Sequence, residues 1–180
     1  MTKKVLVPVA DGIEELEAVT IIDILRRAGA EVTVASVDAI QVVASRKTKL
    51  TADCLIAHCA NETFDLIALP GGLPGAVHLR ESATLTGLLE SQAEAGRLYA
   101  AICASPVVVL KAHGLLPQRA TCHSGFQKEL HQPAPPESSV VVDGHCTTSC
   151  GIGTALEFAL TLAEQICGAE IAAQVRNSLR

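Results

Sequence analysis

The chain has 180 residues, of which 49% are hydrophobic and 18% charged, and its formal net charge is -5. This length suits one domain, residues 1–180, with a full hydrophobic core, and the composition is too apolar for a disordered chain. Aromatic residues make up only 2%, and basic residues form no cluster, which argues against specific nucleic-acid binding. No apolar run reaches the ~18 residues of a membrane span and the start lacks a signal-peptide pattern, so we expect a cytoplasmic protein with no membrane partner.

Short apolar runs rich in β-branched residues alternate with stretches whose apolar residues recur at helical spacing. The first pattern predicts strands over residues 4–10, 31–37, 64–69, 97–102, 120–122, 140–143 and 146–149. The second predicts helices over residues 14–28, 79–96, 106–113, 154–167 and 169–178, with Ser82 as one possible N-cap. An edge excursion is expected around residues 42–44 and 49–51, and a proline-rich loop over residues 132–136.

Strand and helix alternation predicts an α/β fold with a mostly parallel sheet and helices on both faces. In such folds the ligand crevice lies beyond the carboxyl ends of the strands, near the point where the strand order reverses. Three segments follow predicted strands directly: residues 11–17, 70–75 and 103–106. We expect these three segments to meet at one site.

The segment from Ala101 to Ser105 (AICAS) has the form small-x-nucleophile-x-small around Cys103. This spacing is typical of a nucleophile elbow, because a sharp strand-to-helix turn leaves room only for small neighbours. Pro106 suits the first turn of the following helix. A sulfur above that helix N-terminus is expected to have a lowered pKa. The alternative is that Cys103 is a buried small hydrophobic residue, which is the common fate of a free cysteine.

Three glutamates open the first predicted helix, and the helix dipole accounts for Glu14 and Glu15. Glu17 could instead face the crevice and, when protonated, donate a hydrogen bond to the Cys103 thiolate. Burial and a neighbouring negative charge both raise a carboxyl pKa, so a protonated Glu17 is physically reasonable.

Two further features point toward the same crevice. The Pro-Gly-Gly turn at residues 70–72 lets backbone amides face a ligand, so Gly72 and Ala104 could form an oxyanion hole. His123 follows a predicted strand and could polarise a substrate or move a proton, although a lone histidine is more often structural.

Four motifs together resemble the DJ-1/ThiJ/PfpI family, in particular its DJ-1/ThiJ-like branch. They are residues 11–19 (DGIEELEAV), 69–72 (LPGG), 100–106 (AAICASP) and 153–160 (GTALEFAL). The similarity runs from about Lys4 to about Val175. It implies a flavodoxin-like three-layer sandwich with a cysteine nucleophile elbow, no cofactor, and a homodimer.

The resemblance also implies roles for individual residues. Cys103 would be the oxidisable nucleophile, Glu17 its protonated partner and His123 the pocket histidine. The residues implied for oxyanion and substrate binding are Gly71, Gly72, Ala104 and Arg46. The chain departs from the branch at Ser105, where glycine is usual, at Ser124, where proline is frequent, and in the turn over residues 149–154, which lacks the usual Arg and Pro. The departure in the turn is expected to change the wall of the pocket.

The activity implied by the family is glyoxalase- or deglycase-like, on a small reactive carbonyl compound or on glycated protein or nucleotide, together with protection against oxidative stress. A non-enzymatic redox-sensing chaperone is an alternative that needs the same activated sulfur. A cysteine peptidase or amidotransferase-like hydrolase is a further alternative. Its full triad is not visible, because Ala104 stands where peptidases carry histidine and no His-x-Glu pair follows.

Seven cysteines, an odd number, occur without a secretion signal, so reduced thiols are expected rather than a disulfide scaffold. Adjacent His and Cys residues at 58–59, 122–123 and 145–146 would point to opposite faces of a strand, so no metal site is expected. The sequence leaves open the roles of the other six cysteines: Cys54, Cys59, Cys122, Cys146, Cys150 and Cys167.

Overall fold

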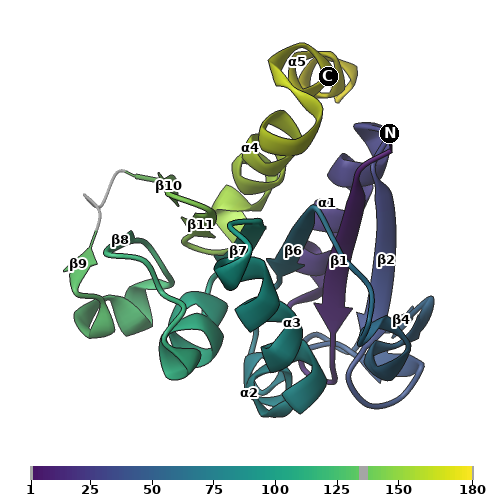
Figure 1. Ribbon diagram of the computed structural model, residues 1–180, viewed down its shortest axis with the longest axis vertical. Helices are drawn as coiled ribbons and strands as arrows, with labels where there is room; N and C mark the ends of the chain where they lie inside the picture. Colours follow the sequence, from purple (N-terminus) through teal and green to yellow (C-terminus); the bar gives the residue numbers. More distant parts are fainter. Residues whose placement is uncertain (1, 134–137, 180) are drawn as a thin grey trace.

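The structure, a computed structural model, describes residues 2–133 and 138–179 (Figure 1). Its main strands are β1 (Lys4–Val9), β2 (Glu31–Ser36), β5 (Cys54–Leu55), β6 (Leu66–Leu69), β7 (Leu98–Ile102), β10 (Val140–Asp143) and β11 (Cys146–Ser149). Within the described residues they form a seven-stranded sheet in the order β10-β11-β7-β6-β1-β2-β5. Every neighbouring pair is parallel except β10 with β11, which form an antiparallel hairpin.

Helices cover both faces of this sheet. Helix α1 (Glu15–Arg27) joins β1 to β2, whereas α2 (Gly75–Glu81) and α3 (Ala83–Glu94) join β6 to β7 in the opposite direction along the sheet. Because such crossovers are almost always right-handed, opposite directions place the helices on opposite faces, as α1 and α3 are in Figure 1. Helix α4 (Ala155–Cys167) packs on α1, and α5 (Ala169–Ser178) packs on α4. The predicted three-layer α/β sandwich is confirmed.

The core is aliphatic, as the near-absence of aromatic residues requires. All four residues of β6 are fully buried, and so are Val5, Leu6 and Val7 in β1, because helices cover both faces of these strands. Phe158 of α4 is among the largest fully buried side chains. This buried centre fixes the carboxyl ends of β1, β6 and β7, from which the site is built.

One predicted helix is wrong in its extent. The expected helix over residues 79–96 is two helices, α2 and α3, separated at Ser82. Ser82 has an extended backbone, and its hydroxyl accepts a hydrogen bond from Leu85 N at 3.3 Å. The predicted N-cap is therefore confirmed for α3, and the residues before it form a separate helix of about two turns, α2, after the glycine-rich loop.

The other differences lie in short elements. The predicted strand over residues 120–122 begins earlier, as β8 (Arg119–Ala120), and pairs in parallel with β9 (Gln132–Pro133). The expected loop over residues 132–136 is thus wrong at its first two residues, and residues 134–136 lie outside the described part. The helix after Cys103 is a π-turn followed by a 3₁₀-turn: η2 (Pro106–Leu110) and η3 (Lys111–His113).

Two further elements follow β2 in the chain: the β3–β4 hairpin and the edge strand β5. The expected excursion is a hairpin of β3 (Gln41–Val43) and β4 (Lys49–Thr51). Strand β5 was not predicted; it adds an edge strand beside β2 and leads into the 3₁₀-turn η1 (Ile56–Cys59). Among the described residues, no helix has both the length and the apolar character needed to cross a membrane.

Candidate active site

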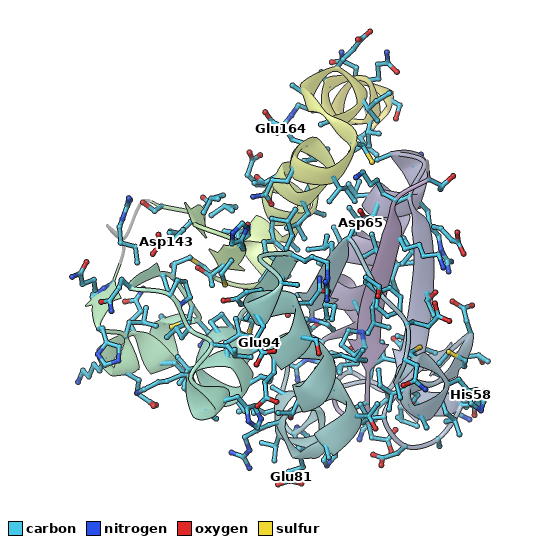
Figure 2. The ribbon with its side chains drawn as sticks, in the orientation of Figure 1. His58, Asp65, Glu81, Glu94, Asp143 and Glu164 are labelled. Carbon is cyan, nitrogen blue, oxygen red and sulfur yellow. The ribbon has the colours of Figure 1, made fainter. Side chains whose placement is uncertain are left out.

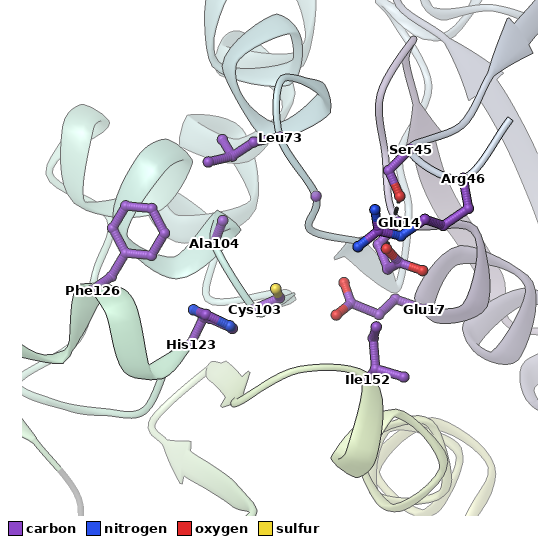
Figure 3. Close-up of a pocket in the computed structure, with 11 residues that line it drawn as sticks. Glu14, Glu17, Ser45, Arg46, Leu73, Cys103, Ala104, His123, Phe126 and Ile152 are labelled. Carbon is purple, nitrogen blue, oxygen red and sulfur yellow. Dashed lines mark hydrogen bonds between the residues drawn. The ribbon is translucent and has the colours of Figure 1, made fainter.

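A cavity of about 340 Å³ lies at the carboxyl ends of β1, β6 and β7 (Figure 3). This is where the strand order reverses, since β1 continues to β2 on one side and pairs with β6 on the other. The cavity size is in the range of small-molecule sites. The lining residues are Glu14, Glu17, Ser45, Arg46, Gly72, Leu73, Cys103, Ala104, His123, Phe126 and Ile152.

Cys103 occupies a sharp turn between β7 and η2, with a φ of +65°, a conformation that non-glycine residues seldom adopt. Neighbouring segments hold this turn: Cys103 N donates to Ser149 O at 3.0 Å, and His123 N donates to Cys103 O at 2.8 Å. Gly71 leaves the space that the turn needs, because a Cβ there would lie 2.5 Å from Cys103 Cβ. The predicted elbow geometry is present.

Ser105 links this elbow to the glycine-rich loop. Its fully buried hydroxyl donates to Pro70 O at 2.6 Å, and the amide of the same peptide group, Gly71 N, donates to Glu17 Oε2 at 2.8 Å. The Pro70–Gly71 peptide is therefore held from both sides. Because hydrogen bonds in a chain polarise one another, Ser105 strengthens the donor that faces Glu17.

Glu17 is fully buried beside the thiol. Burial raises its pKa to about 7, and the nearby charge of Glu14 acts in the same direction, while the Gly71 amide and the Cys103 thiol oppose the shift. No N–H or O–H group of the described residues donates to Oε1, which leaves the sulfur of Cys103 as the neighbour on that side. Figure 3 shows the carboxyl group of Glu17 turned toward the Cys103 sulfur.

The predicted lowering of the Cys103 pKa is wrong for the state in which Glu17 is ionised. Burial and then the negative charge of Glu17 raise the thiol pKa to about 12. The amides of Gly72 and Ala104 donate toward the sulfur and act in the opposite direction. The sequence prediction rested on a helix dipole, but η2 is a single turn, and neither burial nor the facing carboxylate could be judged from sequence.

Cys103 and Glu17 titrate as a pair. An ionised carboxylate opposes formation of the thiolate beside it, and a thiolate opposes loss of the carboxyl proton, so the two groups share one proton over a range of pH. When that proton is on Glu17, the thiolate faces a neutral carboxyl and two amide donors.

The β3–β4 hairpin forms one wall of the cavity, and Glu15 holds it in place. The Glu15 carboxylate accepts hydrogen bonds from Arg46 N at 3.0 Å and from the Ser45 hydroxyl at 2.9 Å. Slight burial raises its pKa, but these bonds together with those from Thr48 and its own backbone dominate and lower it to about 2. Ser45 also bonds Glu14 Oε2 at 2.8 Å, so a glutamate explained by the helix dipole alone has a second, tertiary role.

His123 and Phe126 form the opposite wall (Figure 3). Their rings meet edge to face with centroids 6.5 Å apart. Gly125 N donates to His123 Nδ1 at 3.2 Å, which assigns the neutral tautomer with its proton on Nε2. A neutral imidazole of this kind can donate from Nε2 to a carbonyl group in the cavity.

The structure brings together Cys103, Glu17 and His123, and Arg46 lines the same cavity. Gly72 and Ala104 present their amides to the sulfur, and Gly71 lies behind the loop with its amide on Glu17.

Sequence reasoning did not single out Ser45 or Phe126, which come from loops that carry no motif of their own. Leu73 and Ile152 lie in segments that it did place at the site, residues 70–75 and the turn over residues 149–154. The same turn contains Gly151, where a Cβ would lie 3.8 to 3.9 Å from atoms of Glu17, Cys103 and His123. The described residues contain no group of three or more His, Cys, Asp or Glu side chains arranged to hold a metal ion.

Comparison with known proteins gives a consistent result. A sequence model of the DJ-1/PfpI family matches residues 3–165. Protein DJ-1 homolog B of Arabidopsis thaliana is 47% identical over 179 residues, which cover 98% of this chain and 41% of the relative. The chain therefore spans less than half the length of that relative.

Two further similarities cover nearly the whole of both chains. The glutathione-independent glyoxalase DJR-1.2 of Caenorhabditis elegans is 36% identical over 168 residues, covering 92% of this chain and 89% of the relative. The solved structure of oxidized Toxoplasma gondii DJ-1 has 48% sequence identity and a TM-score of 0.93, covering 99% of this chain and 98% of that one. The similarity thus includes both sequence and fold.

Proposed function

Because the chain belongs to the DJ-1/PfpI family, we propose that it is a cysteine-dependent enzyme that acts on reactive 2-oxoaldehydes or their adducts with protein or nucleotide. The reaction is glyoxalase- or deglycase-like, of the hydrolase or lyase class, and needs no added cofactor. It removes carbonyl compounds that accumulate under oxidative stress. The relative named a glutathione-independent glyoxalase supports this substrate class.

One observation carries the proposal: the Cys103 sulfur faces two backbone amides and a buried carboxyl group inside a cavity of about 340 Å³. Two amides that converge on one point stabilise an anion, whether it is the thiolate or an alkoxide that replaces it. The carboxyl group supplies a proton whose release is tuned close to neutral pH. Nucleophile, anion site and proton donor are thus within one small volume.

The proposed mechanism begins with the proton on Glu17 and a thiolate on Cys103. The sulfur attacks the aldehyde carbon of the 2-oxoaldehyde, the C=O π bond opens, and the amides of Gly72 and Ala104 stabilise the alkoxide. Glu17 gives its proton to this alkoxide to form the hemithioacetal and, now ionised, takes the proton from this carbon and returns it to the adjacent one, while His123 can donate from Nε2 to the adjacent carbonyl oxygen. The hydroxyl proton passes from the first oxygen to the second, which converts the hemithioacetal to a thioester of the 2-hydroxy acid. Water hydrolyses the thioester, which releases the 2-hydroxy acid and restores the thiol.

The surroundings of His123 argue against a peptidase-type triad. Its Nδ1 accepts a hydrogen bond from the Gly125 amide, whereas in a triad this nitrogen donates to an acid. A redox-sensing chaperone remains the second candidate, favoured by the same activated sulfur at Cys103. Turnover separates the two, since a sensor consumes no methylglyoxal.

The test is consumption of methylglyoxal and formation of lactate by the purified protein without glutathione. Replacing the nucleophile, Cys103→Ser, is expected to lower kcat/KM by at least about 1,000-fold while the fold is retained. The matched control is Cys167→Ser, at a half-buried cysteine that ends α4, which is expected to stay within two-fold of the unmodified protein. Full activity in Cys103→Ser, or no turnover by the unmodified protein, would refute the enzymatic proposal.

The partner we propose is a second copy of this chain. Exposed apolar side chains occur on α1, at Leu16 and Val19, and near the start of α4, at Ile152 and Leu156, and these two helices pack together. Such a patch is typical of an interface between copies. Sedimentation velocity checks this: a dimer is expected, and Leu16→Glu is expected to shift it to monomer.

A further inference from the structure

A second pair of sulfur atoms lies outside the cavity, at the edge of the sheet. Cys54 Sγ and Cys59 Sγ are 3.7 Å apart, in thiol–thiol contact. Cys54 belongs to the edge strand β5, and Cys59 ends the following 3₁₀-turn η1. The turn brings two cysteines five residues apart in sequence face to face.

This pair is separate from the nucleophile. Four strand spacings divide β5 from β7, which is about 19 Å across the sheet. Figure 2 labels His58, which lies between Cys54 and Cys59 in sequence, on one flank of the molecule, and Asp143 of β10 on the other. Within one protomer, therefore, Cys54 cannot reach the sulfur of Cys103.

The two thiols differ in their surroundings. Cys54 is half-buried, so a small oxidant can reach it, whereas Cys59 is 3% exposed and packs into the core beside Ile56. Burial and then the contact with Cys54 raise the pKa of Cys59 to about 12. This asymmetry makes Cys54 the sulfur that meets oxidant first and Cys59 the sulfur that resolves it.

We propose that Cys54 and Cys59 form a second oxidation site, which reacts with hydrogen peroxide to give a reversible intramolecular disulfide. The Cys54 thiolate attacks the peroxide O–O bond, giving a sulfenic acid and hydroxide, which takes up a proton to become water. The Cys59 sulfur then attacks the Cys54 sulfur; the S–S bond forms, the S–O bond breaks, and the departing hydroxide leaves as water with the proton from Cys59. Two thiols lose two electrons, and one peroxide becomes two waters.

The geometry permits this bond with little movement. A disulfide needs sulfur atoms about 2.05 Å apart, so the pair must approach by roughly 1.7 Å, which rotations about the two Cα–Cβ bonds can provide. The short edge strand leaves one side of the loop free of sheet pairing. A metal ion is a poorer occupant, since no third His, Cys, Asp or Glu ligand completes a cluster among the described residues.

The sequence offers a clean readout. Trypsin cuts after Lys49 and after Arg80, and the peptide between them contains Cys54 and Cys59 and no other cysteine. The full-length protein is treated with a brief pulse of hydrogen peroxide, free thiols are alkylated, and the peptides are weighed. Formation of the disulfide is expected to remove two hydrogen atoms, about 2 Da, from this peptide and to block alkylation at both sites; dithiothreitol reverses it.

Variants distinguish the oxidation of Cys54 from the closure of the disulfide by Cys59. Cys59→Ser is expected to abolish the 2 Da loss and to leave a sulfenic acid on Cys54 that dimedone traps. Cys103→Ser is expected to form the disulfide as readily as the unmodified protein, so this result does not depend on the proposed enzymatic function. Three outcomes would overturn the proposal: both cysteines alkylated in full after a pulse that oxidises Cys103, dimers linked through Cys54, or loss of the disulfide in Cys103→Ser.

Discussion

Two sulfur sites in this chain share one property and differ in another. Burial is the largest cause that raises the pKa of Cys103 and of Cys59, to about 12 in each case. The buried position of each thiol therefore makes it less acidic. At Cys103, however, two amides and a proton-carrying carboxyl group surround the sulfur. At Cys59 the polar neighbour is a second thiol. The chemistry of a cysteine here follows from its neighbours rather than from its depth.

The different neighbours suit Cys103 to holding an anion and suit the Cys54–Cys59 pair to the disulfide chemistry that we propose. The second largest contribution to the raised Cys103 pKa is the charge of Glu17, and one proton on Glu17 removes that charge. Cys59 is affected in the same way by the charge of Cys54, but its partner is a second sulfur rather than a carboxyl group. Cys103 can therefore exist as a thiolate with a single negative charge in its site, next to two amide donors and a neutral carboxyl group, whereas the proposed reaction at the sheet edge begins when an oxidant takes electrons away.

The largest expected effect comes from removing the proton that distinguishes the two sites. Glu17→Gln keeps an acceptor for the Gly71 amide but removes the acid, and kcat/KM is expected to fall about 100-fold. With the carboxylate gone, the Cys103 pKa is expected to fall, which thiolate absorbance near 240 nm reports. Glu164→Gln, at the exposed position on α4 labelled in Figure 2, is the control. Turnover within two-fold of the unmodified protein would show that Glu17 moves no essential proton.

The same variant also changes how stability depends on pH. Because the folded state holds the Glu17 proton up to about pH 7 and the unfolded chain only to about 4.5, the unmodified protein is expected to lose stability as pH rises between these values. The loss is of order 3 kcal/mol, and Glu17→Gln is expected to lack it. Urea unfolding at pH 5 and pH 8 measures this difference. Equal slopes in both proteins would mean that Glu17 is ionised throughout.

Glu15 does not confuse that measurement. Its pKa is lowered to about 2 in the folded state, so the stability that it contributes is present above its unfolded pKa and is lost as pH falls toward 2. Glu15 and Glu17 are two residues apart in sequence, but their environments shift their pKa values in opposite directions, so they affect stability in different pH windows.

Some features of the site could be predicted from the sequence, and others could not. The elbow at Cys103 could be predicted because its constraint is local: small residues must flank a turn with positive φ. The longer strands of the sheet followed from apolar runs rich in β-branched residues, whereas β5 and β9, of two residues each, did not. The direction of the Cys103 pKa could not be predicted, because it depends on burial and on a carboxylate brought in from α1.

Other contacts were missed for a related reason. The helical spacing of apolar residues continues from α2 into α3 without a break at Ser82. Periodicity alone therefore predicts one helix where the structure has two. The Cys54–Cys59 contact depends on an edge strand of two residues and one 3₁₀-turn, elements too short to leave a periodic signal. Ser45 and Phe126 enter the cavity from loops whose approach is set by tertiary packing.

A smaller effect is expected from Ser105, which supports the Cys103 site from behind and has no counterpart at the sheet edge. Ser105→Ala leaves the buried Pro70 carbonyl without its donor and is expected to cost about 1–3 kcal/mol of stability. The Gly71 donor to Glu17 weakens, so the pH profile of kcat is expected to shift upward and turnover to fall about 10-fold. The exposed Ser91→Ala is the control. An unchanged pH profile would reduce Ser105 to a packing role.

The smallest expected effect concerns the independence of the two sulfur sites. Closing the Cys54–Cys59 disulfide tethers a loop at the edge of the sheet, four strands from β7, and neither cysteine lines the cavity. Protein oxidised until the pair is linked, under a pulse too mild to modify Cys103, is expected to turn over methylglyoxal within two-fold of the reduced protein. Measuring both forms on one preparation, before and after dithiothreitol, controls for losses. A larger change would mean that β2 and β1 transmit strain from the edge to the loop after Val9, which ends at Glu14, and to the first turn of α1, which carries Glu17. The two sites would then be coupled through the sheet.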